Sequence, residues 1–308
     1  MRIKKSSLKP IARTLAKELA FTITVLLGVS IGVYAMLMAT PSEHISEVIN
    51  TAATASQNKP WLDYFAWLER IVSGDLGTQV RNGEPVAPQL FRAAGATLIL
   101  VTGTLIVSLM IALPLAVCEA MGKTKSLTRP LLVTLYLASA LPSFWLAYVV
   151  IYVSTRYFNY FPVVDGVTTP LPITGLAIAL LVLGSGLATA TTRHLNSELT
   201  RVLSQDYITA AIAKGAGVWR HAYLEGVLLP TLEIIATRLS YVIGACVVVE
   251  QVLNWPGLGR LVWQAAQERD TATVMGAVLI CAVWVALAHL FQRTVYILLN
   301  PRASHMGF

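Results

Sequence analysis

Long apolar runs constrain this chain more than any other feature of its sequence. There are six such runs. Five of them contain a long apolar stretch without charged residues, and the sixth contains Glu233 and Arg238 as its only charged residues. Each is long enough to cross a bilayer, which takes about 20 apolar residues. Because backbone groups in lipid must be hydrogen-bonded within their own segment, we predict an all-α, polytopic membrane fold. The six predicted membrane helices are residues 21–39, 93–118, 131–155, 171–192, 226–249 and 271–298.

The composition agrees with a membrane protein and excludes several other classes. Charged residues make up 13% of the 308 residues, whereas a soluble domain carries about 25%. All three cysteines fall in apolar segments, so we interpret them as packing residues and not as a disulfide framework. Cysteine and histidine nowhere cluster with the spacing of metal ligands, so we expect no metal site.

The basic residues predict the orientation of the six helices. With six spans both termini lie on one side, and that side carries 15 Lys and Arg residues, counting Arg293 near the end of the last span, against 7 on the other. The positive-inside rule therefore assigns residues 1–20, the loop 193–225 and the tail 301–308 to the cytoplasm. Residues 40–92 form an extracytoplasmic loop. The topology accounts for the net charge of +7, so we expect no nucleic-acid partner.

The cytoplasmic loop between the fourth and fifth spans holds a short predicted helix. The side chain of Asp206 can accept a hydrogen bond from a first-turn amide, and Gly215 can end the helix in the left-handed conformation. The helix formers Ala210, Ala211 and Ala213 lie between them. A short helix of small residues outside the membrane suits a groove in another protein. An ordinary connecting helix is the alternative.

A proline- and glycine-rich segment follows the fifth span. We expect Pro256 to stop the incoming helix, and Gly257 and Gly259 to let the backbone reverse. Residues 260–269 can then form a short re-entrant or surface helix. An outer gate is one interpretation, and a purely structural turn is the other. The candidate residues here are Glu250, Trp255, Pro256, Gly257, Gly259 and Arg260.

Four residues within the spans are candidates for a transport pathway. A charge inside a span costs about 3 kcal/mol, so Arg238 should face the bundle interior, water or an acidic partner. A structural ion pair or a snorkelling side chain is the alternative. His289 could line a pathway or bond to a neighbour at a helix end. Pro142 should kink the third span near Trp145, and this kink either shapes a pathway or only packs.

The sequence contains no recognisable catalytic constellation, and no nucleophile stands in a pattern with a general base. Gly122-Lys123-Thr124 is like the end of a phosphate-binding loop, but Val117 occupies the position of its first glycine. The preceding element is also a predicted membrane helix and not a strand. If ATP drives this protein, the ATPase is therefore a separate chain.

Five motifs occur along the chain, each on the side of the membrane that the charges assign to it. They are Gly74-Asp75-Leu76-Gly77, then Pro142 to Leu146, then Asp206-Tyr207 to Lys214-Gly215 with Leu229-Pro230, then Glu250 with Trp255-Pro256-Gly257-Leu258-Gly259-Arg260, and Asn300-Pro301-Arg302. Together they resemble the permeases of ABC importers, in the oligopeptide, dipeptide and nickel branch. Thr209 stands where the general motif of the cytoplasmic loop has Glu.

This resemblance implies the type I importer permease fold and a coupling helix that docks on a cytoplasmic ATPase. The implied coupling residues are Asp206, Tyr207, Ala210, Ala211, Lys214 and Gly215. It also implies a bacterial inner-membrane complex with a second related permease, two ABC ATPases and an extracytoplasmic substrate-binding protein. ATP and Mg²⁺ would bind the ATPases, so this chain would hold no cofactor and would not be an enzyme. It would form half of a pathway that works by alternating access.

Peptides are the substrates expected from the resemblance. Nickel chelates, cationic antimicrobial peptides and polyamines remain open, because the binding protein usually sets the specificity of such systems. A stand-alone channel or secondary transporter is a different class. The scarcity of intramembrane charges and the lack of an inverted repeat of interrupted helices argue against it. A membrane scaffold or sensor is a third possibility.

Overall fold

The computed structural model describes residues 8–38, 60–122, 125–159, 173–215, 223–268 and 270–299, and these are almost entirely helical. Their only extended pairing is an isolated bridge between Thr78 and Pro85. The predicted all-α fold is confirmed. The helices are α1 (Leu8–Met38), α3 (Pro60–Val72), α4 (Val86–Ala120), α5 (Lys125–Ala140), α6 (Ser143–Phe158), α7 (Ile173–Leu203), α8 (Asp206–Ala213), the π-helix η2 (Leu224–Leu228), α10 (Leu229–Val252), α11 (Leu258–Gln267) and α12 (Thr271–Leu299). The motif at 300–302 lies outside the described residues.

Five of these helices are long and apolar enough to cross a membrane. Their spanning parts are Leu19–Met36, Val86–Ala120, Thr174–Leu203, Gly226–Val252 and Thr271–Tyr296. A sixth span would need α5 and α6 together, but the two are bent by 107°. The single kinked helix predicted for 131–155 is therefore wrong. Pro142 stands before α6 with ψ at 138°, an extended conformation, and this interrupts the helix completely.

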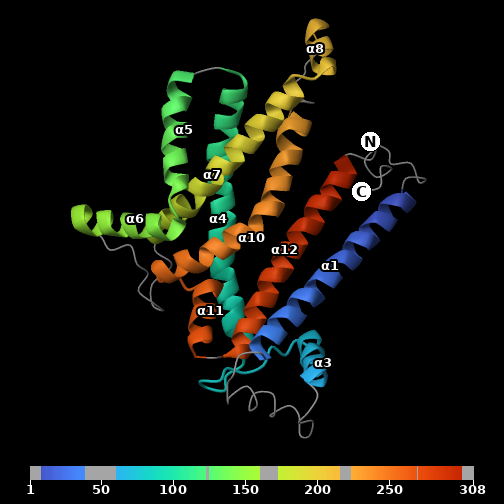
Figure 1. Ribbon diagram of the computed structural model, residues 1–308, viewed down its shortest axis with the longest axis vertical. Helices are drawn as coiled ribbons and strands as arrows, with labels where there is room; N and C mark the ends of the chain where they lie inside the picture. Colours follow the sequence, from blue (N-terminus) through green and yellow to red (C-terminus); the bar gives the residue numbers. More distant parts are fainter. Residues whose placement is uncertain are drawn as a thin grey trace. The chain divides into compact units, whose positions relative to one another are not determined.

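The described chain divides into two compact units, residues 96–259 and residues 1–95 with 260–308. In the first unit, α7 packs on α5, α6, η2 and α10. It has 31 residues and is therefore about 46 Å long, well above the ~30 Å of a hydrocarbon core. The helix continues past the predicted end of its span at residue 192. It carries α8 at its far end (Figure 1).

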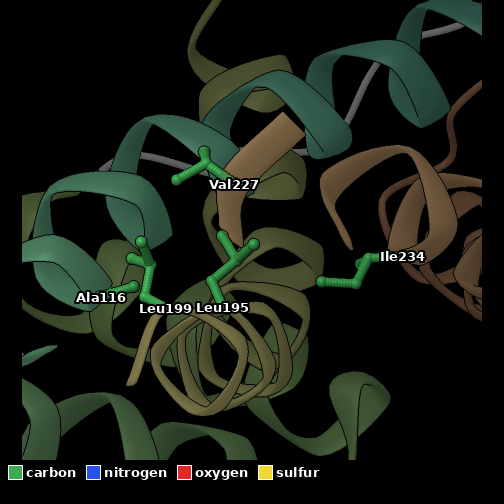
Figure 2. Packing of buried hydrophobic residues seen from close by; sticks show 5 residues of the cluster. All are labelled: Ala116, Leu195, Leu199, Val227 and Ile234. Carbon is green, nitrogen blue, oxygen red and sulfur yellow. The ribbon is translucent and has the colours of Figure 1, made fainter. Parts of the chain in front are cut away.

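A buried apolar cluster holds this overhanging part of α7 in place. We call it the inner cluster, and its members are Ala116 of α4, Leu195 and Leu199 of α7, Val227 of η2 and Ile234 of α10. Figure 2 shows their side chains converging between these elements. Gly226 lies so close to α7 that a Cβ there would stand 3.1 Å from Leu199 Cδ2. The cluster therefore joins α4, α7 and α10 near the base of α8.

In the second unit, α1 packs along α12 (Figure 1). The amphipathic helix α3 packs on α1 through the hydroxyls of Ser30 and Tyr64, which are 2.8 Å apart. The ring of Tyr34 meets that of Tyr64 edge-on at 5.3 Å. Gly74 ends α3 with φ at 88°, and the amide of Asp75 donates to the carbonyl of Arg70 at 2.9 Å. This is the hydrogen-bonding pattern of a Schellman motif, and it explains the first glycine of the sequence Gly-Asp-Leu-Gly.

Candidate functional site

The short helix predicted from sequence between the fourth and fifth spans exists as α8, but its first residue has a different role from the one predicted. Gln205 is the N-cap, with φ −72° and ψ 142°, and no side chain caps the helix. Asp206 therefore lies in the first turn, where its negative charge interacts favourably with the positive end of the helix dipole. Gly215 follows the C-cap Lys214 and has φ at 69°, the left-handed conformation expected of it. Its amide donates to the carbonyl of Ile212 at 2.9 Å.

One face of α8 is attached to the protein and the rest is open. Ile208 is completely buried, and α8 contacts α7. Tyr207, Ala210, Ala211 and Lys214 share another face, because they follow three- and four-residue spacing. Of these, Ala211 is half-buried and the other three are exposed. The helix thus exposes a ridge formed by Tyr207, Ala210 and Lys214, while Ile208 on another face is buried.

A stripe of exposed residues runs along the whole of α10. Its members recur every three or four positions, so they lie on one face of the helix. Most are polar, although α10 lies within one of the membrane spans. We call this the α10 stripe, and it consists of Glu233, Thr237, Ser240, Tyr241, Gly244, Val248 and Gln251.

The exposed faces of α4 and α1 are more apolar than the α10 stripe, although Thr102 of α4 and Thr24 of α1 are also exposed. The exposed large side chains of α4 within the first unit are Leu98, Ile99, Ile106 and Met110. Those of α1 are also apolar, from Leu19 to Met36. Lipid accepts such surfaces, whereas polar groups within a span are costly unless they meet water or protein. The α10 stripe, most of whose side chains are polar, is therefore better suited than the exposed face of α4 to line an aqueous path.

Arg238 lies beside the α10 stripe, exposed at the surface of this chain and not inside its bundle. It forms no ion pair with any residue that the structure describes. Ile234 and Val242, one turn away on either side, are buried, so its long side chain reaches out past the packed face. Of the three surroundings predicted for Arg238, the interior of this chain's own bundle is excluded. The side chain of Arg238 therefore faces either water or a second protein.

The other pathway candidates are not brought into this site. Pro142 and Trp145 are exposed at the start of α6, where the third predicted span breaks. His289 is exposed on α12, which belongs to the other compact unit. The sequence missed the α10 stripe apart from Glu233. A polar residue every three to four positions in an apolar run was the available signal.

The turn after α10 is built differently from the sequence prediction. The helix ends at Val252, four residues before Pro256, so proline does not stop it. Asn254 has φ at 56°, and the amide of Trp255 donates to the carbonyl of Glu250 at 2.8 Å. Asparagine tolerates this left-handed conformation, and the resulting Schellman motif closes the helix. The predicted short helix follows as α11, starting at Leu258 instead of residue 260.

The carboxylate of Glu250 is completely buried and organises this turn. One oxygen, Oε1, accepts from the hydroxyl of Thr97 at 2.6 Å, and the other, Oε2, accepts from the amide of Gly259 at 2.7 Å. The same Thr97 hydroxyl oxygen accepts from the amide of Leu258 at 2.7 Å. The buried indole of Trp255 donates to the carbonyl of Ala96 at 3.1 Å. These donors offset the cost of burying a charge and tie the turn to α4.

The two glycines of this turn are required because a side chain would clash there, and not because the backbone needs a left-handed conformation. Neither Gly257 nor Gly259 has a positive φ, so the predicted reason is wrong. A Cβ at Gly257 would lie 2.2 Å from Glu250 Oε1, and one at Gly259 would lie 2.3 Å from Val247 Cα. Glycine lets the chain pass directly over the carboxylate and α10. Arg260, half-buried, belongs to the first turn of α11.

Comparison with known proteins identifies the family. Residues 108–305 match the profile of the family described as "Binding-protein-dependent transport system inner membrane component". The chain belongs to this family. The family expected from the five motifs is therefore confirmed, and it is a family of membrane permeases.

Individual relatives resemble the chain over most of its length. It is 29% identical over 315 residues to the oligopeptide transport system permease protein AppB of Bacillus subtilis (strain 168), covering 96% of this chain and 100% of that protein. The dipeptide transport system permease protein DppB of Alkalihalophilus pseudofirmus is 23% identical, covering 94% and 98%. The nickel import system permease protein NikB of Staphylococcus aureus (strain USA300) is 25% identical, covering 78% and 72%.

Proposed function

We propose that this chain is one of two permease subunits in an ATP-driven importer of peptides in the bacterial inner membrane. The full-length similarity to an oligopeptide permease supports peptides as the substrate class. The similarity to a nickel permease extends over less of both chains. The observation that carries a role in transport is the α10 stripe, an exposed polar face on a membrane helix.

In this proposal the α10 stripe faces a water-filled path shared with the second permease subunit. Glu233 and Gln251 stand at opposite ends of the stripe, 18 residues or about 27 Å apart. That distance is close to the thickness of the hydrocarbon core. Polar groups therefore follow one another across nearly the whole span. Such a lining suits a peptide, whose backbone needs hydrogen-bonding partners all along its route.

The proposed partner of α8 is a cytoplasmic ABC ATPase. Two such ATPases would bind ATP and Mg²⁺, and a substrate-binding protein would deliver peptide at the outer face. Both termini and α8 would lie in the cytoplasm, as the excess of basic residues predicts. The exposed ridge formed by Tyr207, Ala210 and Lys214 would fill a groove in the ATPase.

Force would pass from α8 into the membrane through the inner cluster. Ile208 fixes α8 to the end of α7, and Leu195 and Leu199 of α7 meet α4 and α10 in the cluster. Close-packed interiors transmit a displacement because they have little room to absorb it. Closure of the ATPases would then tilt α7 and α10 together and open the path to one side of the membrane at a time.

Reconstitution of the complete complex in lipid vesicles tests this function. This chain is combined with the second permease, the two ATPases and the binding protein, and ATP hydrolysis and uptake are measured. We expect peptides to stimulate hydrolysis and to accumulate only when ATP is present. Nickel chelates and polyamines serve as competing substrate classes. Uptake without ATP, or by this chain alone, would contradict the proposal and indicate a channel or secondary transporter.

A further inference from the structure

Glu250 differs from the other buried acid among the described side chains. Asp270, which is 4% exposed, caps its own helix by accepting from the amide and the hydroxyl of Thr273. Glu250 instead receives hydrogen bonds from Thr97, 153 positions away in sequence, and from Gly259 beyond the turn. A helix needs no such distant donors merely to end, because the Schellman motif already closes α10. The carboxylate therefore has a second role, which is to fasten α4 to the turn.

Helices α4 and α10 are fastened to each other at two levels. At one level, Ala116 of α4 and Ile234 of α10 belong to the inner cluster together with Leu195 and Leu199 of α7. The Thr97–Glu250 pair joins the same two helices at their other ends. Nineteen residues, or about 28 Å, separate Thr97 from Ala116 along α4. Two helices fastened at one point can pivot, whereas two fastenings this far apart make them move as one body.

We propose that Thr97 and Glu250 are positioning residues that make the turn after α10, residues 253–259, move together with α8. This inference rests on the proposed function, because it assumes that an ATPase displaces α8. The displacement enters through the inner cluster, and the Thr97–Glu250 pair carries it to residues 253–259 at the far end of α10. ATP hydrolysis at the inner face and opening of the outer mouth are thereby linked within this one subunit.

The direction of each hydrogen bond determines which substitutions break the link. The amide of Leu258 donates to Thr97 Oγ1, so the hydroxyl hydrogen of Thr97 is left for Glu250. Serine keeps both interactions, whereas valine has the shape of threonine but neither donates nor accepts. Thr104 provides a matched control, because it is a fully buried threonine of the same helix whose hydroxyl has no partner among the described residues.

The test compares Thr97→Val with Thr97→Ser and Thr104→Val in the reconstituted complex. The measured quantity is peptide taken up per ATP hydrolysed, together with ATP hydrolysis in the absence of peptide. Loss of these two buried hydrogen bonds should lower uptake per ATP about tenfold in Thr97→Val. The basal hydrolysis rate should stay unchanged. Thr97→Ser and Thr104→Val should both keep the wild-type ratio.

Other results would contradict either this inference or the proposed function, and the two cases can be distinguished. A merely structural role would lower uptake and hydrolysis together and leave their ratio unchanged. If Thr97→Val does not assemble, Glu250→Gln provides the second variant, since its amide group presents a donor where both oxygens now accept. If neither assembles, the pair acts in folding and the inference is wrong. A wild-type complex without ATP-dependent uptake would instead contradict the proposed function.

Discussion

At the residue scale, close approach explains what glycine does in the turn after α10. The sequence indicated the right positions, Gly257 and Gly259, but for the wrong reason. A glycine followed or preceded by proline is typical of a reversing backbone, and no pattern shows which atoms pass within 3 Å of it. Here the missing information was the position of the Glu250 carboxylate, which lies seven residues earlier in sequence and directly beneath the turn.

Gly257→Ala tests this spatial requirement. The added methyl group would stand 2.2 Å from Glu250 Oε1, so the carboxylate or the turn must move. Overpacking of this kind costs about 1–3 kcal/mol, and we expect a lower midpoint of thermal unfolding in detergent. Gly186→Ala is the control, because no atom lies within 4 Å of its added Cβ. Equal midpoints of thermal unfolding for the two variants would show that the turn can accommodate a methyl group at residue 257.

Arg238 should recognise the carboxylate of a passing peptide. Its guanidinium is exposed beside the α10 stripe and unpaired among the described residues. We expect the wild-type complex to respond more strongly to a peptide than to its C-terminally amidated form. A charged hydrogen bond is worth about 1.5–3 kcal/mol, so Arg238→Gln should reduce that preference about tenfold. Peptide-stimulated ATP hydrolysis measures it, and an unchanged preference in an assembled complex would exclude this role.

Thr97 shows where prediction from sequence ends at this scale. Nothing distinguishes it from the other threonines of an apolar helix, and its partner lies 153 positions away. Only the packing of α4 against the turn reveals it. Glu250, by contrast, was predicted as a site residue because it begins the motif that continues with Trp-Pro-Gly-Leu-Gly-Arg.

At the element scale, the unbroken length of α7 decides the geometry of coupling. The sequence predicted its span to end at residue 192, where the first charged residue follows. The helix continues to Leu203 because Leu195, Leu199 and Val202 keep a buried apolar row at helical spacing. Hydropathy predicts where the membrane-spanning part of a helix ends, whereas the spacing of apolar residues predicts where the packed helix itself ends. The two boundaries differ here by 11 residues, and this overhang carries α8.

Leu199→Ala should weaken the inner cluster. Truncating a buried leucine costs about 2–5 kcal/mol through lost contacts and the cavity left behind. We expect a clear drop in the thermal midpoint and weaker coupling of ATP hydrolysis to uptake. Leu181→Ala on the same helix is the matched control, since Leu181 is 61% exposed. A similar drop for both variants would indicate that the cluster has no special role.

The α10 stripe makes a prediction about chemical accessibility. Cysteine placed at Thr237, Ser240 or Gly244 should react with a water-soluble thiol reagent in the assembled complex. Cysteine at Val242, which is buried, should not react. Ile106→Cys provides a sharper control, because Ile106 is 57% exposed but lies on the apolar face of α4. Equal labelling of Ser240→Cys and Ile106→Cys would contradict an aqueous path along α10.

The break between α5 and α6 was beyond prediction for a physical reason. A proline inside an apolar run is compatible with a mild kink or with a complete stop, depending on what the preceding residues pack against. The carbonyl of Leu135 accepts a hydrogen bond from Thr189 of α7, which holds α5 to its neighbour. Such a contact between helices is invisible in the order of residues.

At the scale of the whole molecule, the fold class and the family followed from sequence because they depend on global quantities. Span length, the distribution of basic residues and the order of five motifs each average over many positions, and local errors cancel. The assembly is different in kind. Its partners must be inferred from surfaces, namely the ridge of α8 and the stripe of α10, which only the folded chain displays.

The proposed mechanism requires that α8 lies in the cytoplasm and is bound by an ATPase. Ala210 is exposed on that helix, so Ala210→Cys with a short cross-linker tests it in intact membranes. The unsubstituted chain, with its own three cysteines, is the control. We expect a cross-link to an ATPase subunit and no reaction with a membrane-impermeant reagent added from outside. Labelling of that cysteine from outside, or cross-links that never include an ATPase, would contradict it.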